Sequence, residues 1–593
     1  MSQPMSQPWS QPMSQPTSQP WSQEPWLIDT PPSPRYPVYT RFNANDVLPD
    51  PISPLGASLA WNPHVLRGWA AGYVALGAFT AEELGDLTAV AGFFHGHLYV
   101  NQTVVRRMGI RMGLGWQAID AAFFSSDAPP HDPQADDTNE TLSARLAERT
   151  AWTLSTTTFP EVEEERVLAD AVRASRPDLS AMSGPGLVAW ARAMMPLERL
   201  MWRSETIGGS QAATGPAVLG QLVGVKDPSL VLRLIGRAGD VDSAAPSYAL
   251  WELSRAVRAD AALTAALDGG GVDDLDGILG RHPDFAARFR AFLRDFGYRG
   301  PSEWDLGADS WETRPELALG LIDRLRLLGD EAAPASREGD QEADTAAALG
   351  EAQALLGDDE TAQATLTAAV ASARRFGAWR ERGKTNAIKV LHEARVALFE
   401  LGRRLAVQGH LDRPQQLFMA LDDELDLLTS DPARLTAVLQ QREREWQQLF
   451  DVELPLYVDG REPLGRTADL PPRSRTADSV VAEGEVLQGA PGAAGVARGR
   501  ARVVRDTGDI TAFEPGEVLV APQTDPSWTP LFMVAAAVVV DVGAMGSHAM
   551  IVSRELGIPC AAGVRQATLR IPDGALVEVD GATGTVTVVS LPA

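Results

Sequence analysis

Residues 535–564, AAAVVVDVGAMGSHAMIVSRELGIPCAAGV, decide the fold of the C-terminal part of the chain. The mostly apolar run 535–542 has the length of a buried strand. A loop with Gly543 and Gly546 follows, and then Ser547, a residue type that caps helix N-termini. The helix is predicted to begin at His548 and to end before Gly557, because glycine is favoured just after a helix. The stretch therefore predicts a strand, a glycine loop and a helix.

His548 stands in the first turn of this predicted helix. An anion on its ring would face unpaired backbone N–H groups and the positive end of the helix dipole. Imidazole is also a competent nucleophile near neutral pH. The position therefore suits a histidine that carries a phosphoryl group on a loop of Gly543, Gly546 and Ser547. From position alone, a histidine that only caps or packs at the helix start remains an equal alternative.

Composition and hydrophobic periodicity divide the chain around this stretch. Residues 485–593 alternate short valine-rich runs with Gly and Asp, which predicts a small α/β domain. Residues 458–484 mix Pro, Gly, Arg and Ser and predict a hinge linker. Residues 36–457 show apolar residues at three- and four-residue spacing and predict a large, mainly α-helical domain. The N-terminal 1–35 begins with a Ser-Gln-Pro repeat and is predicted to be a disordered tail.

Composition narrows the classes of function. The chain has 593 residues, with 52 Lys and Arg against 78 Asp and Glu, for a net charge of −26. A protein this acidic is not expected to bind nucleic acid or an anionic membrane surface. A single cysteine, Cys560, excludes internal disulfides and Cys-based metal centres, and the histidines lack the spacing typical of metal ligands. With no secretory signal and no long apolar run, a cytoplasmic protein is expected.

The motif GAMGSHAMIVSRELGIP (543–559) resembles the signature of the phosphohistidine swivelling domain of phosphoenolpyruvate-utilising enzymes. Residues 487–504 and 524–532 (TDPSWTPLF) also resemble this family, whose members include rifampicin phosphotransferase and the phenylphosphate synthase alpha subunit. Gly543-Ala544 replaces the usual Gly-Gly of the family, and Met550 stands where alanine is usual. The resemblance implies that His548 is the phosphocarrier.

The middle region resembles the helical substrate domain of the same family in several segments, among them FGYRGPSEWDL (296–306) and WRERGKTNAIK (379–389). The resemblance implies that Arg380 and Lys384 are cations beside the phosphohistidine. They are four residues apart and share a helix face, and Arg395 is about 60° further round. Three such cations would neutralise a phosphoryl group in transfer. The alternative is a solvated charged face, paired with Glu381 and Glu393.

An acceptor hydroxyl needs a base. Glu303 is the preferred candidate, and Asp305, His95 and His97 are the others. Each has a structural alternative: Glu303 paired with Arg299, Asp305 in a structural role, and the histidines hydrogen-bonded in the core. Arg395, Glu303 and His97 are accordingly predicted to bind the acceptor.

The sequence contains no phosphate-binding GxxxxGK[ST] loop. The resemblance then implies that ATP and Mg²⁺ are bound by a separate ATP-grasp partner, and that this chain binds no cofactor itself. The expected function is transfer of a phosphoryl group from His548 to a hydroxyl of a small organic acceptor. Two alternatives stay open: an enzyme that activates a carbonyl by phosphorylation before a condensation, and a non-catalytic phospho-switch or binding module.

Overall fold

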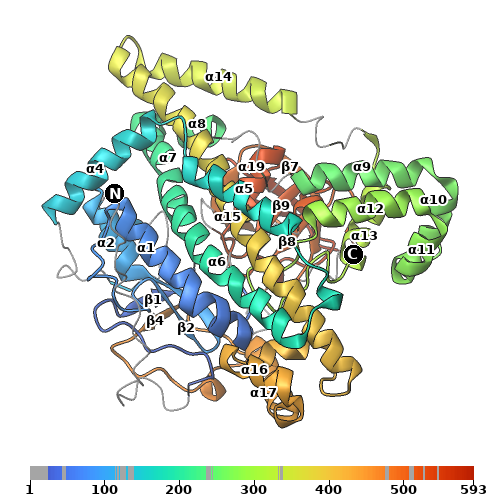
Figure 1. Cartoon of the computed structure of the whole chain (residues 1–593). Helices are drawn as coiled ribbons and strands as arrows, with labels where there is room; N and C mark the ends of the chain where they lie inside the picture. Colours follow the sequence, from blue (N-terminus) through green and yellow to red (C-terminus); the bar gives the residue numbers. More distant parts are fainter. Residues whose placement is uncertain are drawn as a thin grey trace.

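The computed structural model describes residues 25–592, except for 43, 45–47, 114, 117–118, 121–128, 131–138, 236–241, 243–244, 331–332, 334–337, 474–479, 506–512, 525–527 and 544–546. Within this part, a large helical region precedes a small α/β domain (Figure 1). The predicted fold class is thereby confirmed. No helix of the described residues is long and apolar enough to cross a membrane.

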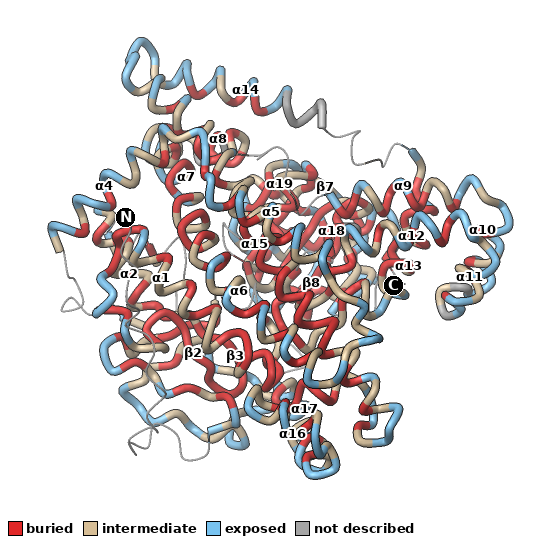
Figure 2. Tube along the Cα trace, in the orientation of Figure 1, coloured by how far each residue is buried: buried red, intermediate tan, exposed pale blue. Residues whose placement is uncertain are grey.

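Two long helices, α6 (Gly184–Ala212) and α15 (Glu360–Val407), run side by side through the centre of the helical region (Figure 1). Side-chain oxygens cap both N-termini: Ser183 accepts from the N–H of Gly186, and Asp359 accepts from that of Ala362 at 3.0 Å. The facing parts of both helices are buried (Figure 2). This pair is the frame on which the other elements are mounted.

Helix α1 (Leu66–Leu76) packs closely on α6, because Gly68 and Gly72 present no side chain to it. A Cβ at Gly72 would lie 2.5 Å from Cβ of Thr206, so a larger residue would push the helices apart.

The other α-helices of the helical region follow in chain order. They are α2 Gln102–Arg111, α4 Glu140–Ser155, α5 Pro160–Ala174, α7 Thr214–Leu219, α8 Pro228–Leu234, α9 Ala245–Ala259, α10 Ala261–Asp268, α11 Leu275–Arg281, α12 Pro283–Phe296, α13 Glu316–Leu325, α14 Glu338–Leu356, α16 Leu425–Ser430 and α17 Thr436–Gln448.

A small sheet lies at the end of the helical region that holds the N-terminal residues. Its strands are β1 (Val38–Thr40), β2 (Ala91–Phe94), β3 (His97–Asn101) and β4 (Tyr457–Asp459), in the order β2-β3-β1-β4. β4 comes from the start of the predicted linker and pairs with β1 in antiparallel register. The linker therefore begins as part of this sheet.

Residues 25–35, assigned to the tail in the sequence analysis, pack against the same sheet. Ile28 is 5% exposed, and the N–H of Phe93 donates to Oγ1 of Thr30 at 2.9 Å. The apolar residues that follow the repeat explain this difference, because they supply the core contacts that Ser-Gln-Pro units lack. The repeat itself, 1–24, lies outside the described residues.

The C-terminal α/β domain is built on an eight-stranded sheet, as far as the described residues go. The strands are β5 Val486–Gln488, β6 Ala490–Ala493, β7 Val496–Val503, β8 Val518–Ala521, β9 Ala537–Val540, β10 Cys560–Ala562, β11 Leu576–Asp580 and β12 Thr585–Ser590, in the order β5-β12-β11-β7-β8-β9-β10-β6. β7 to β10 are parallel neighbours, and the outer strands are antiparallel. Three helices connect them: α18 Thr529–Phe532, α19 His548–Leu556 and α20 Ala567–Arg570. The loop between β9 and α19 lies at the carboxyl end of this parallel set.

The C-terminal domain is docked on the helical region. One hydrophobic cluster joins residues of α9, α12 and α13 to Trp528, Phe532 and Met550 of the C-terminal domain. In Figure 1 the C-terminal sheet lies behind the middle of α15. This contact brings the first turn of α19 to the central helix pair.

Candidate active site

His548 is the first residue of α19, and Gly557 ends that helix in the left-handed conformation with φ of 63°, as the sequence predicts. The imidazole is held by two hydroxyls. Oγ1 of Thr524 lies 2.9 Å from Nδ1, and Oγ1 of Thr529 lies 3.3 Å from Nε2. The ring of Phe532 packs edge-on, with 5.8 Å between the ring centroids. The histidine therefore has a fixed orientation, and it lies at the surface where the C-terminal domain contacts the helical region.

Three charged residues of α15 face this histidine. Nη1 of Arg380 lies 2.8 Å from Oε1 of Glu381, and Nζ of Lys384 lies 3.5 Å from the same oxygen. Arg380, Glu381 and Lys384 all act electrostatically on His548. The structure therefore brings together the three residues that the sequence analysis named as catalytic: His548, Arg380 and Lys384.

The charge states of this cluster follow from burial and from one another. Burial lowers the pKa of His548 to about 3, and the cations Lys384 and Arg380 act in the same direction. Burial opposes ionisation of Glu381, but Lys384 and Arg380 outweigh it and lower the pKa of Glu381 to about 2. At neutral pH the imidazole of His548 is therefore neutral, as a nucleophile must be, and it faces the ionised carboxylate of Glu381.

Arg299 adds a fourth charge that the sequence analysis mentions only as a partner of Glu303. Its guanidinium donates from Nη1 to Glu303 Oε1 and from Nη2 to Thr385 Oγ1, both at 2.8 Å. Thr385 follows Lys384 directly, so Arg299 is anchored beside the cluster, and it acts electrostatically on His548.

The segment that follows Arg299 lies along one stripe of α15. Thr385, His392 and Arg395 are seven and three residues apart and share a helix face. Arg395 is fully buried and donates from Nη2 to the carbonyl oxygens of Glu303 and Asp305. Arg395 therefore holds this loop. It stands 11 residues beyond Lys384, which is about 16 Å along the axis at 1.5 Å per residue.

The candidate bases all have protein partners. Glu303 is buried and paired with Arg299, and Asp305 accepts from the N–H and the hydroxyl of Ser53. His97 lies in β3, where its Nδ1 contacts the carbonyl oxygen of His95 at 2.7 Å. His95 lies 2.8 Å from the hydroxyl of Thr467. Glu303, His95 and His97 thus make the structural contacts that were the alternatives to a catalytic role: Glu303 pairs with Arg299, and the two histidines are hydrogen-bonded.

The loop before α19 is described in part. Gly543 and Ser547 are buried, and Gly546 lies outside the described residues. Ser547 occupies the N-cap position, but its side chain makes no capping hydrogen bond, and its Oγ has no partner among the residues that the structure describes. The expected cap is therefore not made. The hydroxyl stays available beside His548.

A carboxylate from α6 completes the surroundings, and the sequence analysis missed it. Glu205 packs on Gly383 of α15, where a Cβ would lie 3.5 Å from both Cα and Cβ of Glu205. Lys384 and Arg380 act electrostatically on this carboxylate as they do on His548. Thr524 and Thr529 lie in the stretch 524–532 that resembles the family, so the sequence could have indicated them as site residues. No sequence pattern pointed to Glu205.

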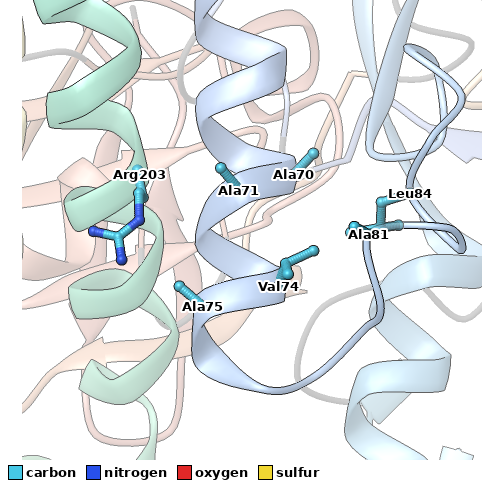
Figure 3. Close-up of a pocket in the computed structure, with 7 residues that line it drawn as sticks. All are labelled: Ala70, Ala71, Val74, Ala75, Ala81, Leu84 and Arg203. Carbon is cyan, nitrogen blue, oxygen red and sulfur yellow. The ribbon is translucent and has the colours of Figure 1, made fainter. Parts of the chain in front are cut away.

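An apolar hollow of about 240 Å³ lies on α1, away from this cluster (Figure 3). Its lining is Ala70, Ala71, Val74, Ala75, Ala81, Leu84 and Arg203. Arg203 and Glu205 are two residues apart on α6, hence about 200° apart around the helix. None of the residues that line the hollow belongs to the His548 cluster.

Comparison with known proteins agrees with this geometry. Residues 203–381 match the model of the rifampicin phosphotransferase fourth domain, and residues 513–584 match that of the PEP-utilising enzyme mobile domain. The first match includes Glu205, Arg380 and Glu381, and the second includes His548. The two matched regions are those that meet at the site.

Several relatives cover parts of the chain. An uncharacterised protein of Mycobacterium tuberculosis is 28% identical over 603 residues, which are 95% of this chain and 63% of that protein. Rifampicin phosphotransferase of Streptomyces sviceus is 30% identical over 51% of this chain and 34% of its own length. Phosphoenolpyruvate synthase of Aeropyrum pernix is 37% identical over 32% of this chain and 20% of its own length.

The chain spans less than two thirds of the length of these relatives. Its two matched regions nevertheless belong to two different family models, one in the helical region and one in the C-terminal α/β domain. In these two regions the chain resembles the phosphoenolpyruvate-utilising enzyme family, and rifampicin phosphotransferase in particular.

Proposed function

We propose that this protein is a phosphotransferase in which His548 is transiently phosphorylated and passes the phosphoryl group to a hydroxyl of a small organic acceptor. The observation that carries the proposal is the approach of His548 to Arg380, Glu381 and Lys384 across the contact between the two domains. A carrier histidine that meets a cationic cluster supports transfer more than storage, because cations neutralise the charge of a phosphoryl group in flight.

Nε2 is the proposed phosphorylated nitrogen. The shorter contact, 2.9 Å between Nδ1 and Oγ1 of Thr524, orients the ring, with Nδ1–H as the donor and the hydroxyl as the acceptor in the proposed tautomer, and Nε2 has only the longer contact to Thr529. The hydroxyl of Ser547 is free to donate to the phosphoryl oxygens beside it. Arg380 would clamp two oxygens with its planar fork, and Lys384 would supply a point charge.

Loading of His548 is proposed to take place elsewhere, on a separate ATP-grasp protein that binds ATP and Mg²⁺. In the docked arrangement the histidine already faces the acceptor-side cations. Loading therefore requires the carrier domain to leave this position on the 458–484 linker. Each end of that linker is anchored to one of the two regions. Its first residues belong to β4, which pairs with β1 of the small sheet, and the N–H of Val481 near its other end donates to the carbonyl oxygen of Arg570 in the C-terminal domain.

The test uses the whole chain and a His548→Ala variant. Both are treated with potassium phosphoramidate, a small reagent that phosphorylates histidine, and in parallel with ATP alone or ATP plus a lysate of the native host. Intact mass is then measured after acid and after alkali. We expect one phosphoryl adduct that survives alkali, is lost in acid and is absent from the variant.

The loaded protein is next mixed with rifampicin, benzyl alcohol or 4-nitrophenol, and phosphate esters are followed by phosphorus NMR. Ester formation faster than loss of phosphate from the denatured, loaded protein supports the proposal. Loss at the same rate as from the denatured protein would contradict the transferase function. An adduct that forms with ATP alone would contradict the separate partner.

A further inference from the structure

Every base that the sequence analysis considered is held by other groups of the protein, so the acceptor's proton needs another destination. A base must lie within hydrogen-bonding reach of the reacting hydroxyl and must have free acceptor capacity. A carboxylate that is bound to arginine or to backbone N–H groups is a weaker base, because these partners stabilise its ionised form. Glu205 is a carboxylate beside the cluster that has no such partner among the described residues.

The side chain of Glu205 lies next to two glycines. Its stem packs against Gly383, which lies between Arg380 and Lys384 on α15. Its Oε1 turns toward Gly209 of α6, where a Cβ would lie 3.2 Å away. A Cβ at Gly383 would be in ordinary contact with the stem of Glu205, and one at Gly209 would press on its Oε1. The side chain of Glu205 therefore lies against α15 beside the two cations.

The carboxylate of Glu205 is also uncommitted. The residue is half-buried, and no hydrogen-bond donor within the described part of the chain reaches it. The charged and titratable groups that face it are Lys384, Arg380 and Glu381 from α15 and Tyr73 from α1. Burial raises its pKa, against the pull of Lys384 and Arg380. A raised pKa makes the ionised carboxylate a stronger base.

We propose that Glu205 is the general base of the transfer, which rests on the proposed function above. In this step the acceptor oxygen bonds to phosphorus and its proton moves to the carboxylate of Glu205. The phosphorus–nitrogen bond to His548 breaks, and its electron pair returns to Nε2. The proton on Nδ1 stays in place, so the histidine is neutral after the transfer. Lys384 and Arg380 face both the donor and the base, and they neutralise the phosphoryl oxygens between them.

The experiment compares Glu205→Gln with Glu198→Gln, each loaded with phosphoramidate as whole chains. Glu198 lies on the same helix, two turns earlier and on the same face, but Trp202 donates to it and it is fully buried. We expect Glu205→Gln to load normally and to transfer to benzyl alcohol about 10²- to 10⁴-fold more slowly than the wild type. Glu198→Gln should transfer like the wild type.

Two further readouts separate a base from a structural residue. The defect should be larger for benzyl alcohol than for 4-nitrophenol, because an acidic phenol depends less on a base. The transfer rate of the wild type should rise with pH and level off, and this rise should be absent in Glu205→Gln. An equal loss for both acceptors with an unchanged pH profile would assign Glu205 a structural role and overturn the proposal.

A Glu205→Ala variant guards against a folding defect, since added formate should restore transfer to the variant but not change the wild type. Absence of rescue, with normal loading of His548, contradicts the proposal. Wild-type protein that transfers to no probe, and loses phosphate only as the denatured protein does, contradicts the transferase function instead. Transfer by the wild type with equal transfer by Glu205→Gln contradicts the base alone.

Discussion

The two ends of the α6–α15 contact use the same residue types for different purposes. At one end, Glu205 of α6 faces Arg380 and Lys384 of α15. At the other, Glu198 of α6 faces Arg395 of α15. Glu198 and Glu205 are seven residues apart, which is two turns or about 10 Å along the axis. Both ends thus place a carboxylate of α6 opposite a cation of α15.

The ends differ in how the protein satisfies these groups. Glu198 accepts from the indole of Trp202 at 3.0 Å, and Arg395 donates to two backbone carbonyls of the loop that follows Arg299. At the other end, Lys384 has its nearest carboxylate oxygen at 3.5 Å, and Glu205 has no donor in the described structure. Charge alone therefore does not mark a site: the site is the end whose hydrogen-bonding capacity has been left for a ligand.

Arg395→Met should have the largest effect, and on stability. The substitution removes both donors to the carbonyls of Glu303 and Asp305 and leaves these buried groups, and the nearby buried carboxylates, without their cation. We expect the free energy of unfolding to fall by about 3–5 kcal/mol. Urea titration followed by far-UV circular dichroism measures it.

The matched control is Lys389→Met on the same helix. Nζ of Lys389 pairs with Asp170 at 2.6 Å, and that carboxylate is 46% exposed. An exposed pair of this kind contributes about 1 kcal/mol or less. Equal losses in Arg395→Met and Lys389→Met would show that the buried end is not held by Arg395.

Lys384→Met should have the opposite pattern. The lysine side chain is 23% exposed, and its ion pair is long, so stability should change by about 1 kcal/mol or less. Transfer from loaded His548 to benzyl alcohol should fall about 10²- to 10³-fold, because one charge that stabilises the transferring phosphoryl group is lost. Single-turnover mixing of the loaded protein with the alcohol measures this rate.

Arg382→Met is the control for Lys384→Met. Arg382 lies between the two cations in sequence, but its guanidinium pairs with Glu163 at 2.7 Å and with Asp242 at 3.2 Å. Glu163 lies in α5, and neither partner belongs to the His548 cluster. A loss of transfer in Arg382→Met as large as in Lys384→Met would mean that the helix, and not the cation, is at fault.

Local patterns predicted the elements well and the shared site only in part. The helix from His548 to its end at Gly557 was predictable, because a cap position, apolar spacing and a terminal glycine all lie within ten or so residues. Arg380 and Lys384 were found through a motif. The grouping of Arg395 with them used the angle around the helix and omitted the distance along it, which is about 16 Å.

Glu205 and Arg299 were not predictable as members of the site, because their placement depends on packing between distant segments. Glu205 reaches the site because α6 lies against α15, where its stem packs on Gly383. Arg299 reaches it because Thr385 and Arg395 hold its loop along one face of α15. Neither contact leaves a periodic signal in the sequence, since each is one residue pair between elements about 90 to 180 residues apart.

Glu198→Gln should leave transfer unchanged and should alter the pH dependence of stability. Burial raises the pKa of Glu198 from 4.5 to about 8 in the folded protein. Between these values the folded state binds more protons than the unfolded state, so this group's contribution to stability is present at acid pH and is lost as pH rises toward 8. The variant should lose a slope of at most about 1.4 kcal/mol per pH unit.

Urea titrations of both proteins across this pH range, followed by tryptophan fluorescence, measure the slope. Glu165, whose pKa burial also raises to about 8, stays in the variant and should retain its own share of the pH dependence. Transfer from His548 should be unchanged in Glu198→Gln. A variant with the wild-type slope and a reduced transfer rate would reverse the assignment of the two ends. It would place the functional carboxylate at Glu198, where its hydrogen bond to Trp202 would have to be broken in each turnover.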